Sequence, residues 1–473
     1  MANLNQLTIT EASKKLAAGE ITSVQLTEAC LAEIEKKNPS LNAYLEVFAD
    51  ALEQARLADE RRALSLSKGL EISPLLGIPL AIKDNILIEG RTASAASKIL
   101  ENYVATYDAT VIKKLKEAGA VFLGRTNMDE FALGGSTENS AYGPTKNPYD
   151  DSRVAGGTSG GSAAAVATHM ALGALGSDTG GSVRNPASFC GVVGLKPTYG
   201  AVSRSGLIAA VSSFDQIGPI TKTVEDAELI FNTIRGQDPL DSTSTENPKS
   251  EIRNPKKKIG VPRTLLEKGV EPDVLACFES SLEKLKGQGC EVVDIALPSL
   301  DYALSAYYII NFAEVSTNLS RFDGVRYGLS LKGESLFDDY ASSREAGFGS
   351  ETRRRIVLGT YVLSAGYYDA YYGKAVAARE QLRREYIKAF ESVDFIATPT
   401  MPDAALVIGE KSDPLSLYLI DIFTVTANLT GNPAISIPMG TVEKEGKQLP
   451  VGLQLTAAHG DEAALFAAGK LLY

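Results

Sequence analysis

The sequence predicts an α/β fold, in which one large domain is built on a mixed β-sheet covered by helices on both faces. From residue 77 onward, short apolar runs bounded by glycine, proline or polar residues alternate with stretches of helical periodicity. Strands of this length that are separated by helices are typical of a largely buried sheet. The chain has 473 residues, of which 44% are hydrophobic, and can therefore bury a sizeable core.

The first 70 residues predict a layer of helices. Two pairs have the spacing of a capping box, a motif that marks a helix start: Thr8 with Glu11, and Thr22 with Gln25. After the second pair, apolar residues recur every four positions, as on one face of an amphipathic helix, at Leu26, Cys30 and Ile34. We therefore assign residues 1–70 to an N-terminal helical layer.

Eight apolar runs predict the strands that follow. They are Ile78–Ile82, Ala120–Leu123, Leu172–Gly176, Ile259–Val261, Val292–Ile295, Phe395–Ala397, Ala434–Ile437 and Val451–Leu455. We divide the rest of the domain into a catalytic core at 71–236, a polar and proline-punctuated surface linker at 237–257, and a second half of the sheet at 258–473. This second half carries a helical insertion at about 298–391.

Composition excludes several classes of protein. The net charge of −11 argues against a broad basic face for nucleic acid, so we expect any contact with tRNA to run mainly through a partner. The four cysteines form no CxxC pair and there are only two histidines, which argues against a zinc site. With no visible secretory signal and no apolar stretch of roughly 18 residues, we expect a cytoplasmic protein without membrane spans.

Residues 156–194 are unusually rich in glycine, serine and alanine, and this segment is the main candidate for chemistry. A phosphate-binding P-loop would need a lysine after its glycines, and none follows. A nucleophile elbow is a second interpretation, because residues 157–161 read Gly-Thr-Ser-Gly-Gly and His459 lies downstream. However, the preceding DDSRVAGG is not a hydrophobic strand. A glycine-rich loop without chemistry is the third.

A fourth interpretation is a serine nucleophile activated by a lysine. Serine hydroxyls need a nearby base, and a lysine can serve when burial lowers its pKa toward neutrality. Lys83 is the candidate base, because it ends the apolar run GIPLAIK and is followed by Asp84 and Asn85.

These motifs resemble the amidase signature family. The resemblance rests on GIPLAIKDNI around Lys83, GGTSGGSAAAVA around Thr158 and GSDTGGSVRNPASFCGVVGLKPTYG around Ser182. It implies a Ser–cis-Ser–Lys triad, with Ser182 as nucleophile, Lys83 as base and the hydroxyl of residue 158 as the bridge between them. It further implies an oxyanion hole made of backbone N–H groups in the loop that carries the nucleophile, at Thr179, Gly180, Gly181 and Ser182.

Three further segments are similar to one subfamily, the A subunits of glutamyl-tRNA(Gln)/aspartyl-tRNA(Asn) amidotransferases. These segments span 125–148, 320–328 and 353–372, so the resemblance covers essentially the whole chain. It implies a glutaminase that supplies ammonia for converting Glu-tRNA(Gln) to Gln-tRNA(Gln), with Asp-tRNA(Asn) as a second candidate acceptor. The expected assembly is a heterotrimer with B and C subunits. ATP and Mg²⁺ are expected in the B subunit, and no cofactor in this one. The alternative is a stand-alone amidase acting on another small amide.

The same resemblance implies how glutamine is recognised. Arg355 matches the residue that binds the α-carboxylate, and Asp421 matches the residue that binds the α-ammonium group. Tyr307 is expected to line the pocket, with Tyr308 as the alternative. One departure concerns the triad: Thr158 stands where most of the family has serine, and the peptide bond before it is expected to be cis. The chain also ends at Tyr473, earlier than is usual in the subfamily.

Overall fold

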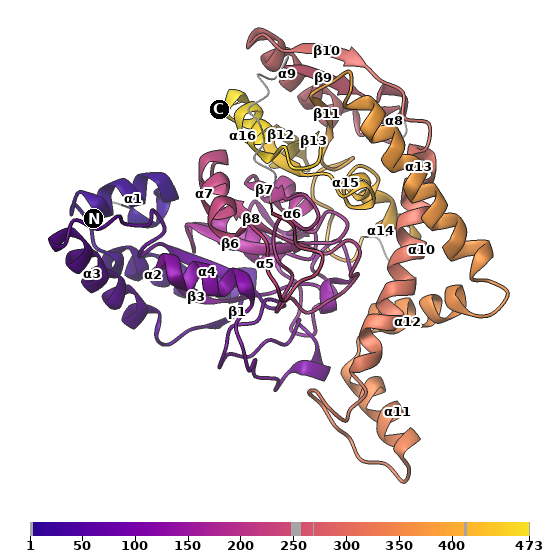
Figure 1. Cartoon of the computed structure of the whole chain (residues 1–473), viewed down its shortest axis with the longest axis horizontal. Coiled ribbons are helices and arrows are strands. Elements are labelled where there is room, and N and C mark those ends of the chain that lie inside the picture. Colours follow the sequence, from indigo (N-terminus) through magenta and orange to yellow (C-terminus); the bar gives the residue numbers. More distant parts are fainter. Residues whose placement is uncertain (1–2, 247–256, 268, 411–413, 473) are drawn as a thin grey trace.

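The computed structural model describes residues 3–246, 257–267, 269–410 and 414–472, and its central feature is one long β-sheet (Figure 1). The strands of this sheet are β1 (Tyr44–Val47), β2 (Pro79–Lys83), β3 (Val121–Thr126), β6 (Gly173–Asp178), β7 (Val193–Lys196), β8 (Gln216–Thr221), β9 (Lys258–Val261), β10 (Glu291–Asp294), β11 (Phe395–Pro399), β12 (Ala434–Lys444) and β13 (Lys447–Ala457). A separate two-stranded sheet is formed by β4 (Lys146–Asn147) and β5 (Asp150–Val154).

The large sheet is mixed, as predicted. Its strand order is β1-β3-β2-β6-β8-β7-β12-β13-β11-β9-β10. Strand β2 runs parallel to β3 and β6, and β9 runs parallel to β10 and β11, whereas the other neighbours are antiparallel. Each of the eight apolar runs overlaps a strand. The sequence prediction missed β1, β4, β5, β7 and β8, most of which carry glycine, proline or charged residues that interrupt an apolar pattern.

Helices pack against the sheet. Their bounds are α1 (Ile9–Ala17), α2 (Ser23–Leu41), α3 (Ala51–Ser67), α4 (Thr110–Ala118), α5 (Gly160–Ala167), α6 (Arg184–Cys190), α7 (Val224–Ile234), α8 (Arg263–Leu266), α9 (Pro272–Gly287), α10 (Leu300–Asn318), α11 (Leu336–Gly347), α12 (Ser350–Leu363), α13 (Lys374–Ala389), α14 (Pro414–Tyr418), α15 (Val425–Thr430) and α16 (Glu462–Gly469). None of the described helices is both long enough and apolar enough to cross a membrane.

The N-terminal layer confirms both predicted helix starts. Thr8 caps α1 and Thr22 caps α2, each in a complete capping box. The stripe Leu26, Cys30 and Ile34 is buried. The layer also contains strand β1, which pairs with β3 at the edge of the large sheet and was not predicted.

The predicted linker is only partly a surface feature. Residues 247–256 lie outside the described part of the chain. In the described part, 237–246, the backbone is irregular, but Asp238, Asp241 and Ser244 are buried. Asp238 accepts hydrogen bonds from the hydroxyls of Thr110 and Ser203, so this portion, most of whose residues are exposed, is fastened to the body of the domain.

The two halves of the chain meet within the sheet. β7, from the first half, pairs with β12, from the second, with Ala434 opposite Lys196. The helical insertion contains α10, α11, α12 and α13 and lies along one side of the molecule, with α11 projecting at the bottom of the view (Figure 1). α10 packs against α12, α13 and α15, and its Glu314 accepts hydrogen bonds from Ser213, which joins the insertion to the catalytic core.

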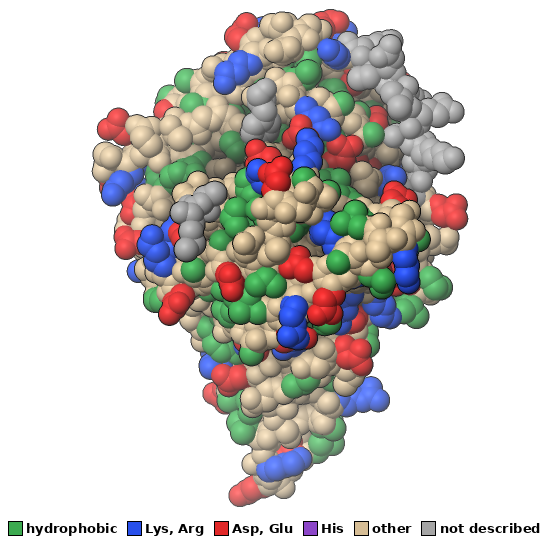
Figure 2. Space-filling view, turned by 90° about the vertical axis from the view of Figure 1, so that its left-hand side faces the viewer, with side chains coloured by type: hydrophobic (Ala, Val, Ile, Leu, Met, Phe, Trp, Pro, Cys, Tyr) green, Lys and Arg blue, Asp and Glu red, His purple; other side chains and the backbone are tan. Residues whose placement is uncertain are grey.

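The surface carries charges of both signs. On the face shown in Figure 2, acidic and basic side chains are interspersed and form no continuous basic area. On this face, at least, the charge pattern is the mixed one expected of a chain with a net charge of −11.

Candidate active site

Lys83 lies at the end of β2 with its amine buried among hydroxyl groups. The side chain has no exposed surface. Its Nζ is 2.7 Å from Thr158 Oγ1, 2.8 Å from Ser159 Oγ and 2.9 Å from Ser177 Oγ. Nζ is also 3.2 Å from the Ser177 carbonyl oxygen. The structure therefore joins the predicted base to the predicted bridging residue.

Burial lowers the pKa of Lys83 to about 7, because an ammonium ion loses its hydration inside the protein. The carboxylates of Asp129, Asp178 and Asp215 oppose this effect and keep the pKa from falling further. Near neutral pH a substantial fraction of the amine is therefore uncharged, as a general base requires.

The hydrogen bonds around the amine leave two hydroxyls able to donate to it, those of Thr158 and Ser177. Ser159 donates its hydroxyl to the Ser177 carbonyl at 3.1 Å, so toward Lys83 it acts as an acceptor. Ser177 Oγ accepts a hydrogen bond from Asn85 at 2.9 Å. Thr158 Oγ1 contacts only Lys83 among the described residues, so its hydroxyl is free to donate to the lone pair of an uncharged amine.

Ser182 lies in the loop between β6 and α6 and presents a free hydroxyl. The residue is 6% exposed. Its Oγ makes no hydrogen bond with a described residue and is not fully buried. A backbone hydrogen bond holds the segment of Thr158 against the loop of Ser182, because the Ser159 N–H donates to the Ser182 carbonyl at 3.2 Å. However, no hydrogen bond joins the hydroxyls of Ser182 and Thr158 in the described structure. A proton transfer between them would require the two side chains to move closer.

One expectation about this loop is corrected. All described peptide bonds are trans, including the bond between Gly157 and Thr158, where a cis bond was expected. Gly157 instead has a φ of +52°, a left-handed conformation that glycine adopts without a steric penalty.

The loop 179–182 has the features of an oxyanion-binding loop, with one exception. Gly181 has a φ of +134°, which side-chain-bearing residues rarely adopt. A Cβ on Gly180 would overlap the hydroxyl of Tyr307, so only glycine fits there. The N–H of Gly181, however, already donates to Asp178 Oδ1 at 2.9 Å. The N–H groups of Thr179, Gly180 and Ser182 are therefore the more available donors of the predicted set.

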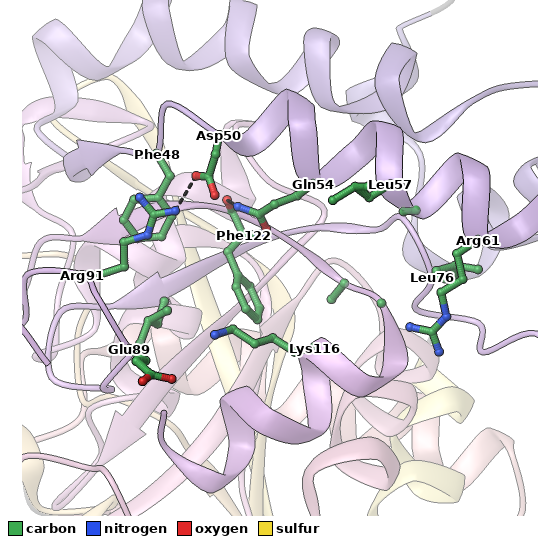
Figure 3. A pocket seen from close by; sticks show the side chains of 14 residues that line it. Phe48, Asp50, Gln54, Leu57, Arg61, Leu76, Glu89, Arg91, Lys116 and Phe122 are labelled. Carbon is green, nitrogen blue, oxygen red and sulfur yellow. Dashed lines mark hydrogen bonds and ion pairs between the residues drawn. The ribbon is translucent and has the colours of Figure 1, made fainter. Parts of the chain in front are cut away.

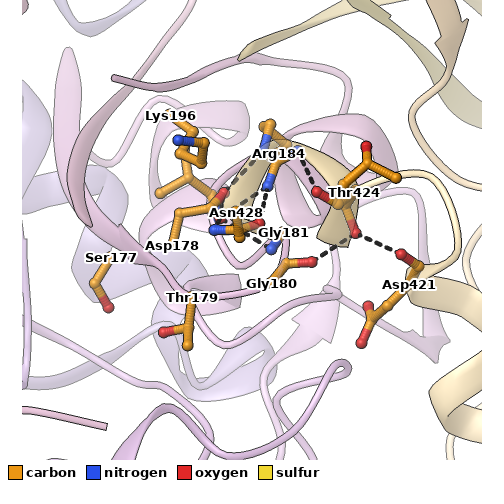
Figure 4. A network of polar contacts seen from close by, with 12 residues as sticks. Ser177, Asp178, Thr179, Gly180, Gly181, Arg184, Lys196, Asp421, Thr424 and Asn428 are labelled. Atoms are coloured by element: carbon orange, nitrogen blue, oxygen red, sulfur yellow. Dashed lines mark hydrogen bonds and ion pairs between the residues drawn. The ribbon is translucent and has the colours of Figure 1, made fainter. Parts of the chain in front are cut away.

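A buried ion pair holds this loop in place (Figure 4). Asp178 and Arg184 have no exposed side-chain surface and are 2.9 Å apart. Besides Gly181, the carboxylate accepts the N–H of Val183 at 3.1 Å. Arg184 also donates to the Thr424 carbonyl and to the side chains of Asn428 and Gln454, all from the second half of the chain. Asp178 and Arg184 therefore order the loop that carries Ser182.

Arg355 keeps donors free for a ligand. It lies on the buried face of α12 with 3% exposure, and its guanidinium is flanked by the rings of Tyr308, Phe312 and Tyr418. Nε donates to Glu351 at 2.7 Å and Nη1 to Asn311 at 3.1 Å. Of five N–H donors, three have no partner among the described residues, which suits a bidentate contact with a carboxylate.

Asp421 contacts Tyr308, one of the aromatic residues that also flank Arg355. Its Oδ2 accepts the hydroxyl of Tyr308 at 2.6 Å, and burial raises its pKa to about 7. Thr424 joins this residue to the catalytic loop, because its hydroxyl contacts both the Asp421 and the Gly180 carbonyls (Figure 4). Tyr307 lies against the loop and Tyr308 against Asp421, so both tyrosines belong to the site.

The alternative that assigned His459 as the base has no geometric support. Nε2 of His459 is 2.9 Å from the Thr430 carbonyl, whereas Ser159, the serine of the elbow motif, is bonded to Lys83 and Ser177.

Sequence reasoning missed three contributors to the site. Ser177 lies in β6 and contacts the Lys83 amine. Asn311 lies between Tyr307 and Arg355, and Glu351 pairs with Arg355. Asn311 follows Tyr307 by four residues on α10, and Glu351 precedes Arg355 by four residues on α12. Residues at this spacing face each other on a helix, so the spacing could have indicated Asn311 and Glu351.

Two other features of the described residues lie apart from this site. A surface pocket of about 350 Å³ is formed between α3, β3 and α4, where Arg91 pairs with Asp50 (Figure 3). None of the residues discussed above lines it. No cluster of three His, Cys, Asp or Glu side chains with metal-binding geometry occurs within the described ranges.

Comparison with known proteins identifies the family. The model of the family described as Amidase matches residues 25–466, which include the whole site. The chain belongs to the amidase family. The assignment places Lys83, Thr158 and Ser182 within the matched region, as the resemblance of their motifs implied.

Amidase relatives match this chain over nearly its full length. It is 52% identical to the A subunit of the glutamyl-tRNA(Gln) amidotransferase of Roseiflexus castenholzii, with 99% of this chain and 96% of the relative aligned. It is 42% identical to the crystal structure of the protein of the same name from Thermotoga maritima, with a TM-score of 0.79 and coverage of 100% and 94%. The peptide amidase of Stenotrophomonas maltophilia is 29% identical, with a TM-score of 0.81 and coverage of 99% and 96%.

The buried pair Asp178–Arg184 yields a testable prediction for this amidase fold. Asp178→Asn should lower the free energy of unfolding by about 3–5 kcal/mol, because it leaves the buried Arg184 charge uncompensated. Urea denaturation of the wild-type chain and of Asp178→Asn measures the difference in the free energy of unfolding. Asp273→Asn, at a partly exposed position, should change it by less than about 0.5 kcal/mol. A loss for Asp178→Asn no larger than that of this control would contradict the assigned role.

Proposed function

We propose that this chain is the glutaminase subunit of a tRNA-dependent amidotransferase, which hydrolyses glutamine and supplies ammonia for the conversion of Glu-tRNA(Gln) to Gln-tRNA(Gln). The observation that carries the proposal is the joint presence of two features. A buried lysine faces hydroxyl groups beside a glycine-rich nucleophile loop, and a buried arginine and aspartate lie on an aromatic wall next to that loop. The identity of 52% to the A subunit of a glutamyl-tRNA(Gln) amidotransferase over almost the whole chain supports it.

In this mechanism uncharged Lys83 takes the proton of Thr158 while Thr158 takes the proton of Ser182. The Ser182 oxygen then attacks the side-chain amide carbon of glutamine, and the carbonyl electron pair moves onto the oxygen. N–H groups of the loop 179–182 stabilise this oxyanion; losing one such donor typically costs about 3–4 kcal/mol of activation energy. Collapse of the intermediate returns the proton to the leaving nitrogen and releases ammonia. Water then hydrolyses the glutamyl ester of Ser182 by the same proton path.

Glutamine is recognised at both α-substituents. The free donors of Arg355 pair with the α-carboxylate, and ionised Asp421 binds the α-ammonium group. Tyr307 and Tyr308 form the wall between them, because their rings meet edge to face at a centroid distance of 5.0 Å. An amide that lacks either charge loses one of these contacts, which explains why such a site would select a free amino acid.

The ammonia is used by a partner. In this proposal the chain assembles with B and C subunits. ATP and Mg²⁺ act in the B subunit, which also holds the tRNA, and Asp-tRNA(Asn) is a second candidate acceptor. The chain itself needs no cofactor for the chemistry described, since a serine, a threonine and a lysine perform it.

A stand-alone amidase is the second candidate, and it is favoured by the likeness to a peptide amidase at 29% identity. A single experiment separates the two candidates. The chain is co-expressed with B and C subunits from a relative, and glutamine-dependent formation of Gln-tRNA(Gln) is measured with and without each of them. Amidation that requires all three supports the proposal. Hydrolysis of peptide amides by the isolated chain, with no amidation by the complex, would favour the second candidate.

The base can be tested by paired substitutions. Lys83→Ala should abolish glutamine hydrolysis by the complex, because no other described side chain in contact with Thr158 accepts a proton. His459→Ala should leave the rate within about twofold, since this ring contacts only a backbone carbonyl. Release of ammonia from glutamine measures both. The reverse pattern would restore the histidine-based interpretation.

The pH dependence follows from two groups that must both be deprotonated. The pKa values of Lys83 and Asp421 are about 7, so log kcat/KM for glutamine should rise with pH below 7 and level off above about 8. Below pH 6 the slope should approach two. Asp421→Asn should reduce it to about one, because only Lys83 then titrates. A slope unchanged by this substitution would contradict the role of Asp421.

Substrate recognition can be tested with free ammonia as the alternative nitrogen source. Arg355→Ala and Asp421→Ala should each lower kcat/KM for glutamine by about 10–100-fold, because each removes a charged hydrogen-bond partner. Ammonia-dependent tRNA amidation should persist. Arg353→Ala is the matched control, since that arginine lies on the exposed face of the same helix. An equal fall in ammonia-dependent activity would instead indicate a damaged assembly.

The bridging position can be tested by two replacements of Thr158. Thr158→Ser keeps the hydroxyl and should be tolerated, whereas Thr158→Val keeps the shape without the hydroxyl and should slow hydrolysis by about 10²–10⁴-fold. Melting temperature and hydrolysis rate should be measured on the same preparations, because the Lys83 amine also loses one of its hydrogen-bond partners, at a cost of about 1 kcal/mol of stability. A folded Thr158→Val protein with a near-normal rate would assign the proton path to another group, such as Ser159.

A further inference from the structure

Asn311 connects two parts of the site that contact different ends of the substrate. It lies in the middle of α10 and is 1% exposed. Arg355 Nη1 donates to Asn311 Oδ1 at 3.1 Å, and Asn311 Nδ2 donates to the Tyr307 hydroxyl oxygen at 3.3 Å. One side-chain amide is therefore shared between the guanidinium and the phenol.

On one side, Asn311 limits how the guanidinium can turn. Glu351 holds Nε and Asn311 holds Nη1, so two adjacent corners of the planar group are fixed from two different helices. The rings of Tyr308 and Tyr418 flank the group, with centroids 5.7 and 5.4 Å from its central carbon. The remaining donors then lie in a defined plane, as bidentate pairing with a carboxylate requires.

On the other side, Asn311 holds Tyr307 against the catalytic loop. The Tyr307 ring stacks on Phe214 with centroids 5.4 Å apart, and its hydroxyl occupies the space that a Cβ on Gly180 would need. The Gly180 carbonyl is held on its other side by the Thr424 hydroxyl at 2.6 Å. The position of the phenol therefore bears directly on the loop that carries the oxyanion donors.

We infer that Asn311 is a positioning residue that makes the rate of amide hydrolysis depend on the α-carboxylate of the substrate. Both hydrogen bonds of Asn311 exist without a ligand; a carboxylate bound to Arg355 restrains the guanidinium further, and Asn311 passes that restraint to the Tyr307 hydroxyl beside Gly180. A substrate without the carboxylate adds no such restraint on Arg355, so its hydrolysis does not gain from the connection through Asn311. The inference rests on the proposed function, because it takes glutamine as the substrate.

The test compares two substrates that differ only in the α-carboxylate. Glutamine carries this group, whereas 4-aminobutanamide has a hydrogen in its place and keeps both the amide and the ammonium. The complex with B and C subunits is assayed for ammonia release from each, with the wild-type chain and with Asn311→Ala. Asn311→Leu, which has a similar volume but no hydrogen-bonding groups, is measured alongside in case the smaller residue impairs folding.

The expected result is selective for glutamine. Asn311→Ala and Asn311→Leu should lower kcat/KM for glutamine by about tenfold to hundredfold, the effect of losing a hydrogen bond to a charged group. The loss should include kcat as well as KM, because the oxyanion loop is affected. For 4-aminobutanamide, kcat/KM should change by less than about threefold. Asn318→Ala removes another buried asparagine of α10, one that contacts Ala210 and Ser212 instead, and should affect both substrates equally.

Two results would overturn the inference. Equal losses on both substrates would assign Asn311 a packing role only, and normal kinetics on glutamine would show that the shared amide is not used. In either case an active wild-type complex leaves the proposed function intact. Failure of the wild-type complex to hydrolyse glutamine at all would overturn the proposed function, and this inference with it.

Discussion

The candidate active site depends on the ion pair between two fully buried side chains, Asp178 at the end of β6 and Arg184 at the start of α6. The carboxylate accepts two backbone N–H groups of the nucleophile loop, and the guanidinium donates to three residues of the second half of the chain. Burying two charges is favourable only when hydrogen bonds satisfy their remaining donors and acceptors, and here these bonds shape the loop around Ser182. The pair thus fixes the nucleophile loop and at the same time attaches it to the segment that carries Asp421 and Thr424.

The same dry environment suits Lys83 to the role of base that the proposed mechanism gives it. Strand β2 ends inside the protein, so the Lys83 amine cannot reach water and is favoured in its uncharged form. Asp129 and Asp215 are buried nearby, and burial raises the pKa of each to about 6. Several buried groups thus titrate within a narrow range around neutrality, a property that clusters at functional sites.

The sequence predicted those features that depend on local pattern or on a recognisable motif. The strand that ends at Lys83, the capping boxes of α1 and α2 and the helical insertion around α10 all follow from spacing along the chain. The positions of Arg355 and Asp421 came from the family resemblance, since neither has a distinctive local pattern. Pattern could not indicate that Gly181 donates to Asp178, that the peptide bond before Thr158 is trans, or that Asp238 is buried. These depend on contacts between segments far apart in the chain.

The pairing of β7 with β12 has a consequence for the making of the protein. Lys83 and Ser182 come from the first half of the chain, whereas Asp421 and the partners of Arg184 come from its last quarter. The two halves of the sheet are joined only when β12 pairs with β7. Such a fold has high contact order, so its loop-closure entropy must be overcome before the distant contacts form. Strands β2, β3 and β6 all precede these segments in the chain, so Lys83 and Ser182 are synthesised well before the residues that complete their surroundings. The proposed glutaminase activity therefore requires the final strands, because only their segment brings Asp421 and the partners of Arg184 to the nucleophile loop.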